Sequence, residues 1–304
     1  MTNIAIIVVV YLIIISITAI ILTVRDKKAA QSKSRRISEK SLLFVSAIGG
    51  SAAMLATMRA IRHKTQHKRF MIGIPAIIIL QIAIAVIIFI HPFFLMNPTE
   101  TGSIPETNVF AVKDGMNSVY LVESESGYIL FDAGTNAKNI ESVLSENDIN
   151  ADDVRQIFLT HSDSDHAGAL SLFPNAEIYI NEDEIPLIDG TVKRNLFGGN
   201  NISVDIDDII RVHDGQTLSI DGIEILCIAA PGHTIGSMSY LVGGRYLFTG
   251  DAFTYRNGKL GIHPFTMDKP QSRETIEMLI GIVQNSEIIV FTSHYGYFTR
   301  EDLR

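Results

Sequence analysis

The sequence predicts an α+β domain preceded by an all-α segment that crosses a membrane. Three observations predict this fold class. The first 96 residues hold long apolar runs, residues 97–107 are polar with two prolines, and residues 108–304 mix strand-like runs with helical ones. Groups of strands with interspersed helices are typical of two sheets covered by helices. We therefore expect a transmembrane domain at 1–96, a linker at 97–107 and one globular domain at 108–304.

Charge and hydropathy divide the chain at the same place. Residues 1–100 carry 12 Lys and Arg against 3 Asp and Glu (+9), and residues 101–304 carry 13 against 30 (−17), which sums to the formal −8 of the 304-residue chain. Mean hydropathy is +0.24. A basic, apolar front and an acidic back indicate a membrane segment joined to a globular domain. The single cysteine, Cys227, is predicted to be a buried thiol.

Two apolar runs are predicted to span the membrane. Ile4 to Val24 is uncharged for 21 positions, which is long enough to cross a bilayer. No basic region precedes it and no cleavage site follows, so we interpret it as an anchor rather than a signal peptide. A second span is expected from Met71 to Met96. Between them, Ser41 to Met58 is rich in small residues and is either a third span or a re-entrant hairpin.

The distribution of basic residues bears on orientation. Segment 25–40 carries seven Lys and Arg and segment 59–69 carries five, so both are expected in the cytoplasm. Three full spans would separate these two segments, whereas two spans with a re-entrant hairpin would keep both inside. The second arrangement places the C-terminal domain outside, and no Lys or Arg follows the last span until Lys113. We expect an extracytoplasmic domain.

Four short motifs give the front segment a resemblance. They are Asp26-Lys27-Lys28-Ala29-Ala30, Arg36-Ile37-Ser38-Glu39, Gly49-Gly50 and Arg62-His63-Lys64-Thr65. Over residues 1–90 the segment resembles a small bacterial inner-membrane family of unknown function, which implies a multi-pass location in the bacterial cytoplasmic membrane and no particular activity. His63 and His67 lie among basic residues, and we expect them in a solvated loop.

The globular domain is predicted to contain the following elements in order. Strands are expected at 108–113, 117–123, 127–132, 155–160, 177–180, 208–213, 217–220, 223–229, 237–242, 244–249 and 287–291; helices at 137–147, 166–172 and 270–285; and a polar helix or loop at 181–196. Turn pairs such as Asp214-Gly215 and Gly243-Gly244 separate the later strands.

The strongest chemical motif follows the strand at 155–160. His161, Asp163, Asp165 and His166 place two imidazoles and two carboxylates within six residues. Imidazole and carboxylate are natural ligands of divalent metals. The alternative is a polar loop that caps the next helix, with Asp165 near the N-cap.

Three later strand ends offer further ligands. His233 lies in Pro231-Gly232-His233-Thr234, Asp251 follows Gly250, and His294 follows Thr292-Ser293. Each alone is weak evidence, but together with the first motif they bring His or Asp to one sheet edge four times.

With these motifs, and Phe131-Asp132-Ala133-Gly134 before them, residues 108–304 resemble the metallo-β-lactamase-fold hydrolases. The resemblance implies an αββα sandwich with two metals at one edge. It implies one ion held by His161, Asp163 and His233, another by Asp165, His166 and His294, and Asp251 bridging both. It assigns Asp165 the catalytic role of orienting the nucleophile, and Asp132 a supporting position behind the ligands.

Asp163 departs from the commonest pattern, which has His there. Zinc is the expected cofactor, and the added carboxylate admits iron or manganese. Flavodiiron proteins of this fold likewise have a carboxylate there, but their flavodoxin domain has no counterpart here. The competence DNA-uptake proteins resemble this chain in having an Asp at this position, but they lack the Pro-Gly-His-Thr motif.

The predicted activity is metal-assisted hydrolysis of an ester, thioester, lactone or similar bond in a small-molecule substrate. The alternatives are a phosphodiesterase or nuclease, and a non-catalytic metal-bound sensor or scaffold. The charge of −17 disfavours nucleic acid as a partner, because nucleic-acid affinity depends on basic surface. Candidate substrate contacts, each with a purely structural alternative, are Tyr255, His263, Tyr295 and Tyr297. His213 is expected to be structural.

Overall fold

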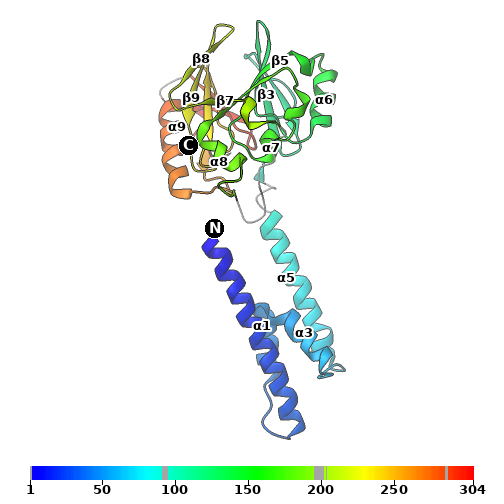
Figure 1. Ribbon diagram of the computed structural model, residues 1–304. Coiled ribbons are helices and arrows are strands. Elements are labelled where there is room, and N and C mark those ends of the chain that lie inside the picture. Colours follow the sequence, from blue (N-terminus) through cyan, green and yellow to red (C-terminus); the bar gives the residue numbers. More distant parts are fainter. Residues whose placement is uncertain (1, 91–94, 195–201, 203, 285–286) are drawn as a thin grey trace. The chain divides into compact units, whose positions relative to one another are not determined.

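The computed structural model describes residues 2–90, 95–194, 202, 204–284 and 287–304 (Figure 1). The chain forms two compact units, Met1–Phe94 and Leu95–Arg304. The predicted end of the second span at 91–94, the end of the polar segment at 195–196 and residue 285 lie outside the described residues.

The first unit is helical throughout its described elements. They are α1 (Thr2–Gln31), α2 (Glu39–Val45), the π-helix η1 (Ser46–Gly50), α3 (Ser51–Ala60), α4 (Lys68–Met71) and α5 (Gly73–Ile90). Three stretches are long and apolar enough to cross a membrane: Val9–Gln31, Glu39–Ala60 and Lys68–Ile87.

The middle stretch folds back on itself as a helical hairpin. Its turn lies at Gly49, whose φ of +120° is readily adopted only by glycine, and this turn lies against Leu12 and Ile15 of α1. Both ends of the hairpin lie at the other end of α1, because Ile37 N donates to Asp26 (3.1 Å) and Lys27 donates to Ile61 O. Of the two predicted alternatives, the contacts fit the hairpin; the first unit is drawn in Figure 1.

Gln81 of α5 forms hydrogen bonds with the backbone where the helix is interrupted at the turn of this hairpin. Its side-chain amide donates to Ser46 O (3.0 Å) and Ala47 O (2.8 Å), and its oxygen accepts from Ser51 Oγ (2.6 Å). Tyr11 donates to Ile48 O (2.6 Å). Carbonyls released by a helix break in an apolar environment need such partners.

The expectation of a solvated His63 is wrong. His63 is buried, and its Nε2 lies 2.8 Å from Asp26 Oδ2, which also pairs with Lys64 at 3.1 Å. The Asp26 carboxylate is fully buried in α1 and requires such partners. His67 is exposed, as expected.

The second unit contains two main sheets. The first has the order β1-β2-β3-β4-β5-β6-β7 and the second β15-β14-β11-β10-β9-β8. Their bounds are β1 Gly102–Ser103, β2 Val109–Asp114, β3 Asn117–Ser124, β4 Gly127–Phe131, β5 Val154–Phe158, β6 Glu177–Asn181, β7 Ile209–Val212, β8 Thr217–Ile220, β9 Ile223–Ala229, β10 Met238–Val242, β11 Tyr246–Phe248, β14 Ile289–Phe291 and β15 Tyr297–Thr299. A small hairpin of β12 (Thr254–Arg256) and β13 (Lys259–Gly261) stands apart from them.

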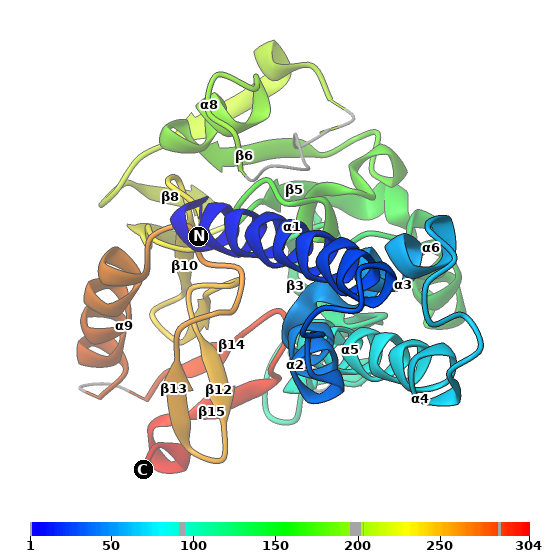
Figure 2. The same cartoon turned by 90° about the horizontal axis from the view of Figure 1, so that it is seen from below.

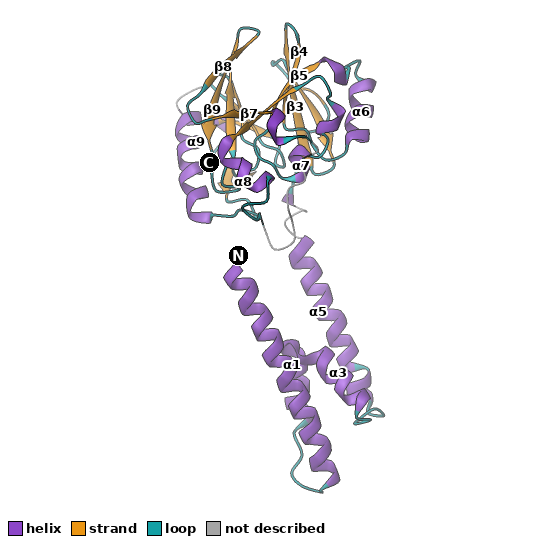
Figure 3. Ribbon diagram, in the orientation of Figure 1, coloured by secondary structure: helices purple, strands orange, loops and turns teal. Residues whose placement is uncertain are grey.

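Helices cover the outer faces of the sheets, which gives four layers (Figures 2 and 3). Apolar residues of both sheets, Phe131 and Phe248 among them, form the central core. Helix α6 (Ala137–Glu146) packs on the first sheet through Ile140, and α9 (Lys269–Gln284) on the second through Leu279. This is the predicted α+β arrangement of two sheets between helices.

Several predicted boundaries differ from the structure. The helix expected at 166–172 is the short α7 (Ser164–Ala167) followed by a 3-10 turn, and the polar segment contains α8 (Ile185–Ile188). Part of the expected linker belongs to the second unit: β1 pairs with β2, and Thr99 is buried with its hydroxyl 2.7 Å from that of Tyr120.

Candidate metal centre

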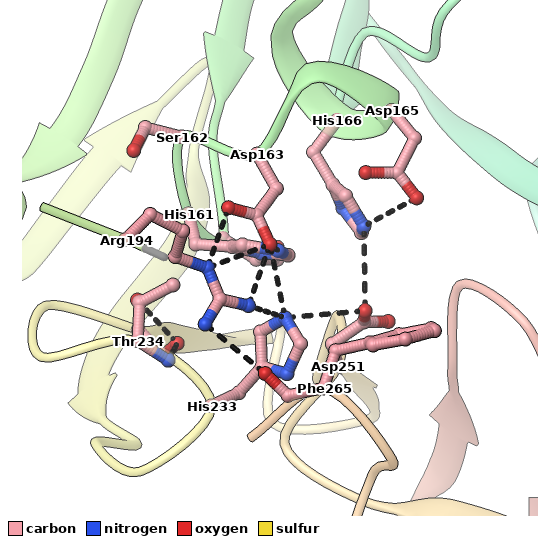
Figure 4. Close-up of polar contacts among 12 residues, drawn as sticks. His161, Ser162, Asp163, Asp165, His166, Arg194, His233, Thr234, Asp251 and Phe265 are labelled. Carbon is pink, nitrogen blue, oxygen red and sulfur yellow. Dashed lines mark hydrogen bonds and ion pairs between the residues drawn. The ribbon is translucent and has the colours of Figure 1, made fainter. Parts of the chain in front are cut away.

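The predicted ligands lie together at one edge of the two sheets, and all except His294 are labelled in Figure 4. His161 and Asp163 follow β5, Asp165 and His166 belong to α7, and His233, Asp251 and His294 follow β9, β11 and β14. Strands β4, β5, β6 and β7 are parallel neighbours, as are β11 and β14, so successive carboxyl ends meet at the same edge.

Asp251 lies at the middle of the cluster. Its Oδ2 is 3.3 Å from His294 Nε2, 3.4 Å from His233 Nε2 and 3.7 Å from His166 Nε2. The preceding Gly250 permits this placement, because a Cβ there would come within 2.3 Å of Thr160 Oγ1. Asp251 thus lies between His166 and His294 on one side and His233 on the other, which is the position that a bridging ligand needs.

Asp165, His166 and His294 form one ligand group on one side of Asp251. Asp165 Oδ2 lies 3.3 Å from His294 Nε2 and 3.8 Å from His166 Nε2. The side chain of Asp165 is 41% exposed, whereas the two histidines are buried. Asp165 is therefore the member of this group that a substrate can reach.

His161, Asp163 and His233 form a second ligand group. Asp163 Oδ2 lies 3.5 Å from His161 Nε2 and 3.3 Å from His233 Nε2. Burial raises the pKa of Asp163, but the nearby His161 and His233 and the hydrogen bonds from Arg194 outweigh it and hold the pKa below its usual range.

Arg194 is a member of the site that the sequence did not reveal. Its Nε and Nη2 donate to both carboxylate oxygens of Asp163 at 2.7–3.0 Å, and Nη2 lies 2.9 Å from His233 Nε2 (Figure 4). Arg194 belongs to the polar segment expected at 181–196, where no motif distinguishes it from its neighbours.

His263 is far more buried than a surface-loop histidine. It is 1% exposed, and its Nε2 lies 3.6 Å from Asp251 Oδ2. Neither ring nitrogen has a hydrogen-bond partner among the described residues. Burial lowers the pKa of His263 to about 3, so the ring is neutral at pH 7. His233, Asp251 and His263 together form a further group of metal-capable atoms.

The residues present fit divalent metal ions. His161 Nε2, His166 Nε2 and Asp251 Oδ1 are buried polar atoms without a hydrogen-bond partner in the described structure. Within each ligand group, one donor atom per residue lies within 4.8 Å of the others. Unpaired buried nitrogens and carboxylate oxygens are costly unless something such as a metal engages them.

Two buried carboxylates outside the ligand groups hold the site in shape. Asp132 accepts from Thr160 N (2.8 Å) and His166 Nδ1 (2.8 Å), which leaves Nε2 of His166 free to face the cluster. Glu184 accepts from the backbone N–H and hydroxyl of Ser162, from Thr234 Oγ1 and from Gly236 N. Glu184 thereby joins the loop of His161 and Asp163 to the loop of His233, which together supply one ligand group.

The ligand histidines differ in the direction of their pKa shifts. Burial alone would lower the pKa of His294, but Asp251 and Asp165 raise it to about 10. Burial likewise opposes the charge on His166, yet Asp132, Asp165 and Asp251 raise its pKa well above the usual value. For His233 burial outweighs the carboxylates and lowers the pKa to about 4. The carboxylates therefore favour positive charge on the Asp165, His166 and His294 side of the cluster.

The structure also describes the candidate substrate contacts. Tyr295 is buried, with its ring 6.1 Å from that of His263 and 6.3 Å from that of His294. Tyr255 stacks on Phe298 at 4.1 Å, and Tyr297 is 42% exposed on β15. His213 pairs with Glu182 at 2.9 Å on an exposed surface.

Comparison with known families agrees with this arrangement. The profile of the metallo-beta-lactamase superfamily matches residues 112–294. The chain belongs to this superfamily. A second profile, that of a protein family of unknown function (DUF1294), matches residues 16–70.

Relatives of this metallo-beta-lactamase superfamily member include proteins named as hydrolases. BaeB of Bacillus velezensis, a probable polyketide biosynthesis zinc-dependent hydrolase, is 31% identical over 44% of this chain and 54% of its own length. Hydroxyacylglutathione hydrolase GloC of Haemophilus influenzae is 27% identical over 60% of this chain and 87% of its own. The chain thus spans about half of BaeB.

Two further similarities concern a short protein and a solved structure of the same fold. The uncharacterized protein YsdA of Bacillus subtilis is 33% identical over 28% of this chain and 94% of its own length. The solved Rm3 metallo-beta-lactamase has a TM-score of 0.52 and 19% identity over 66% of this chain and 81% of its own, which shows a shared fold.

Proposed function

We propose that this protein is a membrane-anchored, metal-dependent hydrolase that cleaves an ester, thioester, lactone or similar bond. The observation that carries the proposal is the position of Asp251 between two ligand groups, with buried ligand nitrogens unpartnered around it. The hydrolase names of several relatives support the same reaction class.

Two divalent ions fit the two ligand groups, with Asp251 between them. When bound, such ions supply Lewis acidity and a water that ionises near neutral pH. Zinc suits the histidine-rich donor set, whereas Asp163 keeps iron and manganese as alternatives.

Asp165 is the residue we propose for proton transfer. Its carboxylate is the most exposed of the three in the cluster, since Asp163 and Asp251 have side-chain exposures of 19% and 5%. A carboxylate in this position can orient the attacking water and pass its proton to the leaving group.

The proposed substrate is a small acyl compound. Hydroxyacylglutathione, which GloC is named for, is a thioester, and thioesters therefore head the substrate classes to test. His263 and Tyr295 lie next to the ligand groups and are the proposed contacts for the substrate on this side.

The hydrolase domain is proposed to lie outside the cytoplasm. The hairpin keeps the basic segments 25–40 and 59–69 at the same end of α1, and such segments favour the cytoplasm. Helix α5 runs away from that end, since its Gln81 bonds to Ser46 and Ala47 at the turn of the hairpin. Cysteines introduced at Ser34 and Ser103 of the full chain, with Cys227 replaced by Ser, test this: an impermeant maleimide should label only position 103 in intact cells. Labelling of position 34 alone would reverse the topology.

The activity test uses the full chain purified in detergent and a panel of thioester, ester, lactone and phosphodiester substrates. We expect hydrolysis of one acyl class, lost on chelation, restored by zinc and reduced at least ~100-fold in Asp165→Ala. Asp152→Ala, an exposed acidic residue, is the matched control. Full activity in Asp165→Ala would refute its role, and turnover of the phosphodiester alone would support the phosphodiesterase alternative.

A further inference from the structure

Arg194 brings a positive charge into a cluster otherwise made of carboxylates and imidazoles. Its side chain is 7% exposed, and a buried guanidinium requires a partner. The Asp163 carboxylate meets this need with both oxygens, as Nε and Nη2 of Arg194 donate to it at 2.7–3.0 Å. Such two-pronged pairs fix the plane of the carboxylate.

A second contact anchors Arg194 independently of Asp163. Nη1 donates to the carbonyl oxygen of Phe265 at 3.1 Å, in the loop that also carries His263 (Figure 4). The guanidinium is therefore held on two sides, and it is a fixed part of this edge of the site.

The charge of the ligand group explains why a cation is needed there. His161 and His233 are neutral donors when they bind a metal, whereas Asp163 adds a negative charge that would lower the Lewis acidity of a bound ion. Arg194 cancels this charge. The three donors and Arg194 together have a net charge of zero, as three neutral imidazoles would.

We propose that Arg194 is the charge partner of Asp163, holding the carboxylate for metal ligation and neutralising it so that the group prefers zinc. This inference rests on the proposed function only in requiring that the site binds metal. Neutral donor sets suit zinc, and uncompensated carboxylates shift preference toward manganese.

The contacts of Nη2 must change when a metal binds. Nη2 of Arg194 lies 2.9 Å from His233 Nε2 and 2.7 Å from Asp163 Oδ2, the two atoms that face each other in this ligand group. Metal binding replaces both contacts, while the bond from Nε to Asp163 Oδ1 (2.8 Å) and the bond to Phe265 can remain. Arg194 thus acts as a positioning residue, and it touches no reacting atom.

The test measures metal binding of the full chain, without any substrate. Zinc and manganese affinities are obtained by chelator competition, and bound metal by elemental analysis, for wild type, Arg194→Gln, Asp163→His and the double variant. Arg211→Gln is the control, because Arg211 is exposed on β7. Melting temperatures show whether each variant is folded.

If Arg194 is the charge partner of Asp163, Arg194→Gln should have opposite effects in two backgrounds. It should worsen the preference for zinc in the wild-type background and improve zinc binding in the Asp163→His background. Arg194→Gln should lower the zinc-over-manganese preference about tenfold, and Asp163→His should weaken zinc binding about 10- to 100-fold because it leaves the guanidinium unpaired beside the metal. In the double variant, removal of Arg194 should restore zinc binding to within about threefold of wild type. A purely structural role predicts a loss in both backgrounds.

Three results would overturn the inference. A double variant that binds zinc no better than Asp163→His, with unchanged selectivity in Arg194→Gln, contradicts it while leaving the proposed function intact. A wild-type chain with one zinc that gains a second in Arg194→Gln would mean that Arg194 excludes a metal. A wild-type chain that binds no metal overturns the proposed function itself, and this inference with it.

Discussion

Asp132 lies behind the candidate ligands, where its carboxylate accepts hydrogen bonds from Thr160 and from His166 Nδ1. Its backbone has a φ of +60°, which is uncommon for a residue other than glycine. A side chain that orients a ligand from behind affects metal affinity without touching the metal.

Asp132→Asn tests this role. The amide keeps the size of the side chain but loses the charge that holds the ring of His166, so zinc affinity should fall about 10- to 100-fold. Chelator competition on the full chain measures it. Asp221→Asn, at an exposed carboxylate bonded to Ser126, should have no effect. Equal affinities in wild type and Asp132→Asn would remove Asp132 from the support of the site.

The raised pKa values predict proton release on metal binding. Asp251 and Asp165 raise the pKa of His294 to about 10, so its ring carries a proton at pH 7.5, and the carboxylates around His166 shift its pKa in the same direction. Zinc requires the free nitrogen, so binding to His294 must expel its proton. Calorimetry in buffers of different ionisation enthalpy should show release of about one proton per chain or more. A binding enthalpy independent of the buffer would contradict this.

Among the residues of the site, the sequence predicted the run from His161 to His166 and the residues that end later strands, and it missed Arg194. His161, His233, Asp251 and His294 each end a strand-like run, and strand ends at one edge converge. Arg194 lies in a polar stretch without periodicity. Only the folded chain shows that its guanidinium faces Asp163.

Among the elements, the hairpin of α2, η1 and α3 depends on one polar residue. Gln81 satisfies the Ser46 and Ala47 carbonyls that the turn at Gly49 releases, in surroundings otherwise apolar. Each such group left unpaired in an apolar environment costs several kcal/mol.

Gln81→Leu should therefore loosen the hairpin without affecting the metal centre. We expect a lower melting temperature of the full chain in detergent and faster proteolysis between residues 39 and 60, with zinc affinity unchanged. Ile79→Leu, at an exposed apolar position of the same helix, is the control. Identical proteolysis in the two variants would show that Gln81 does not stabilise the hairpin.

Element prediction succeeded where a pattern extends over several residues. Strands β2, β3 and β9 have six to eight residues and were predicted, as were α6 and α9. Strands β12, β13 and β15 have three residues each, too few for alternation to show. Composition alone did not distinguish a span from a hairpin at 41–58. The position of Gly49 against α1 indicates the hairpin.

For the whole molecule, two modules of different charge and chemistry are joined in one chain. The DUF1294 profile matches residues 16–70, within the front unit, and the metallo-beta-lactamase profile matches residues 112–294, within the second. Each has its own core within the described residues. The metal chemistry thus belongs to the second unit, and the proposed contribution of the first is attachment to a membrane.

A shared metal centre can be tested by the metal content of the full chain, purified in detergent and dialysed against zinc. We expect two zinc ions per wild-type chain and a loss of both tight sites in Asp251→Ala, because Asp251 lies between the two ligand groups. The exposed Asp207→Ala control should retain two. A wild-type chain without bound metal, or an Asp251→Ala chain that keeps both ions, would contradict a shared metal centre at this edge.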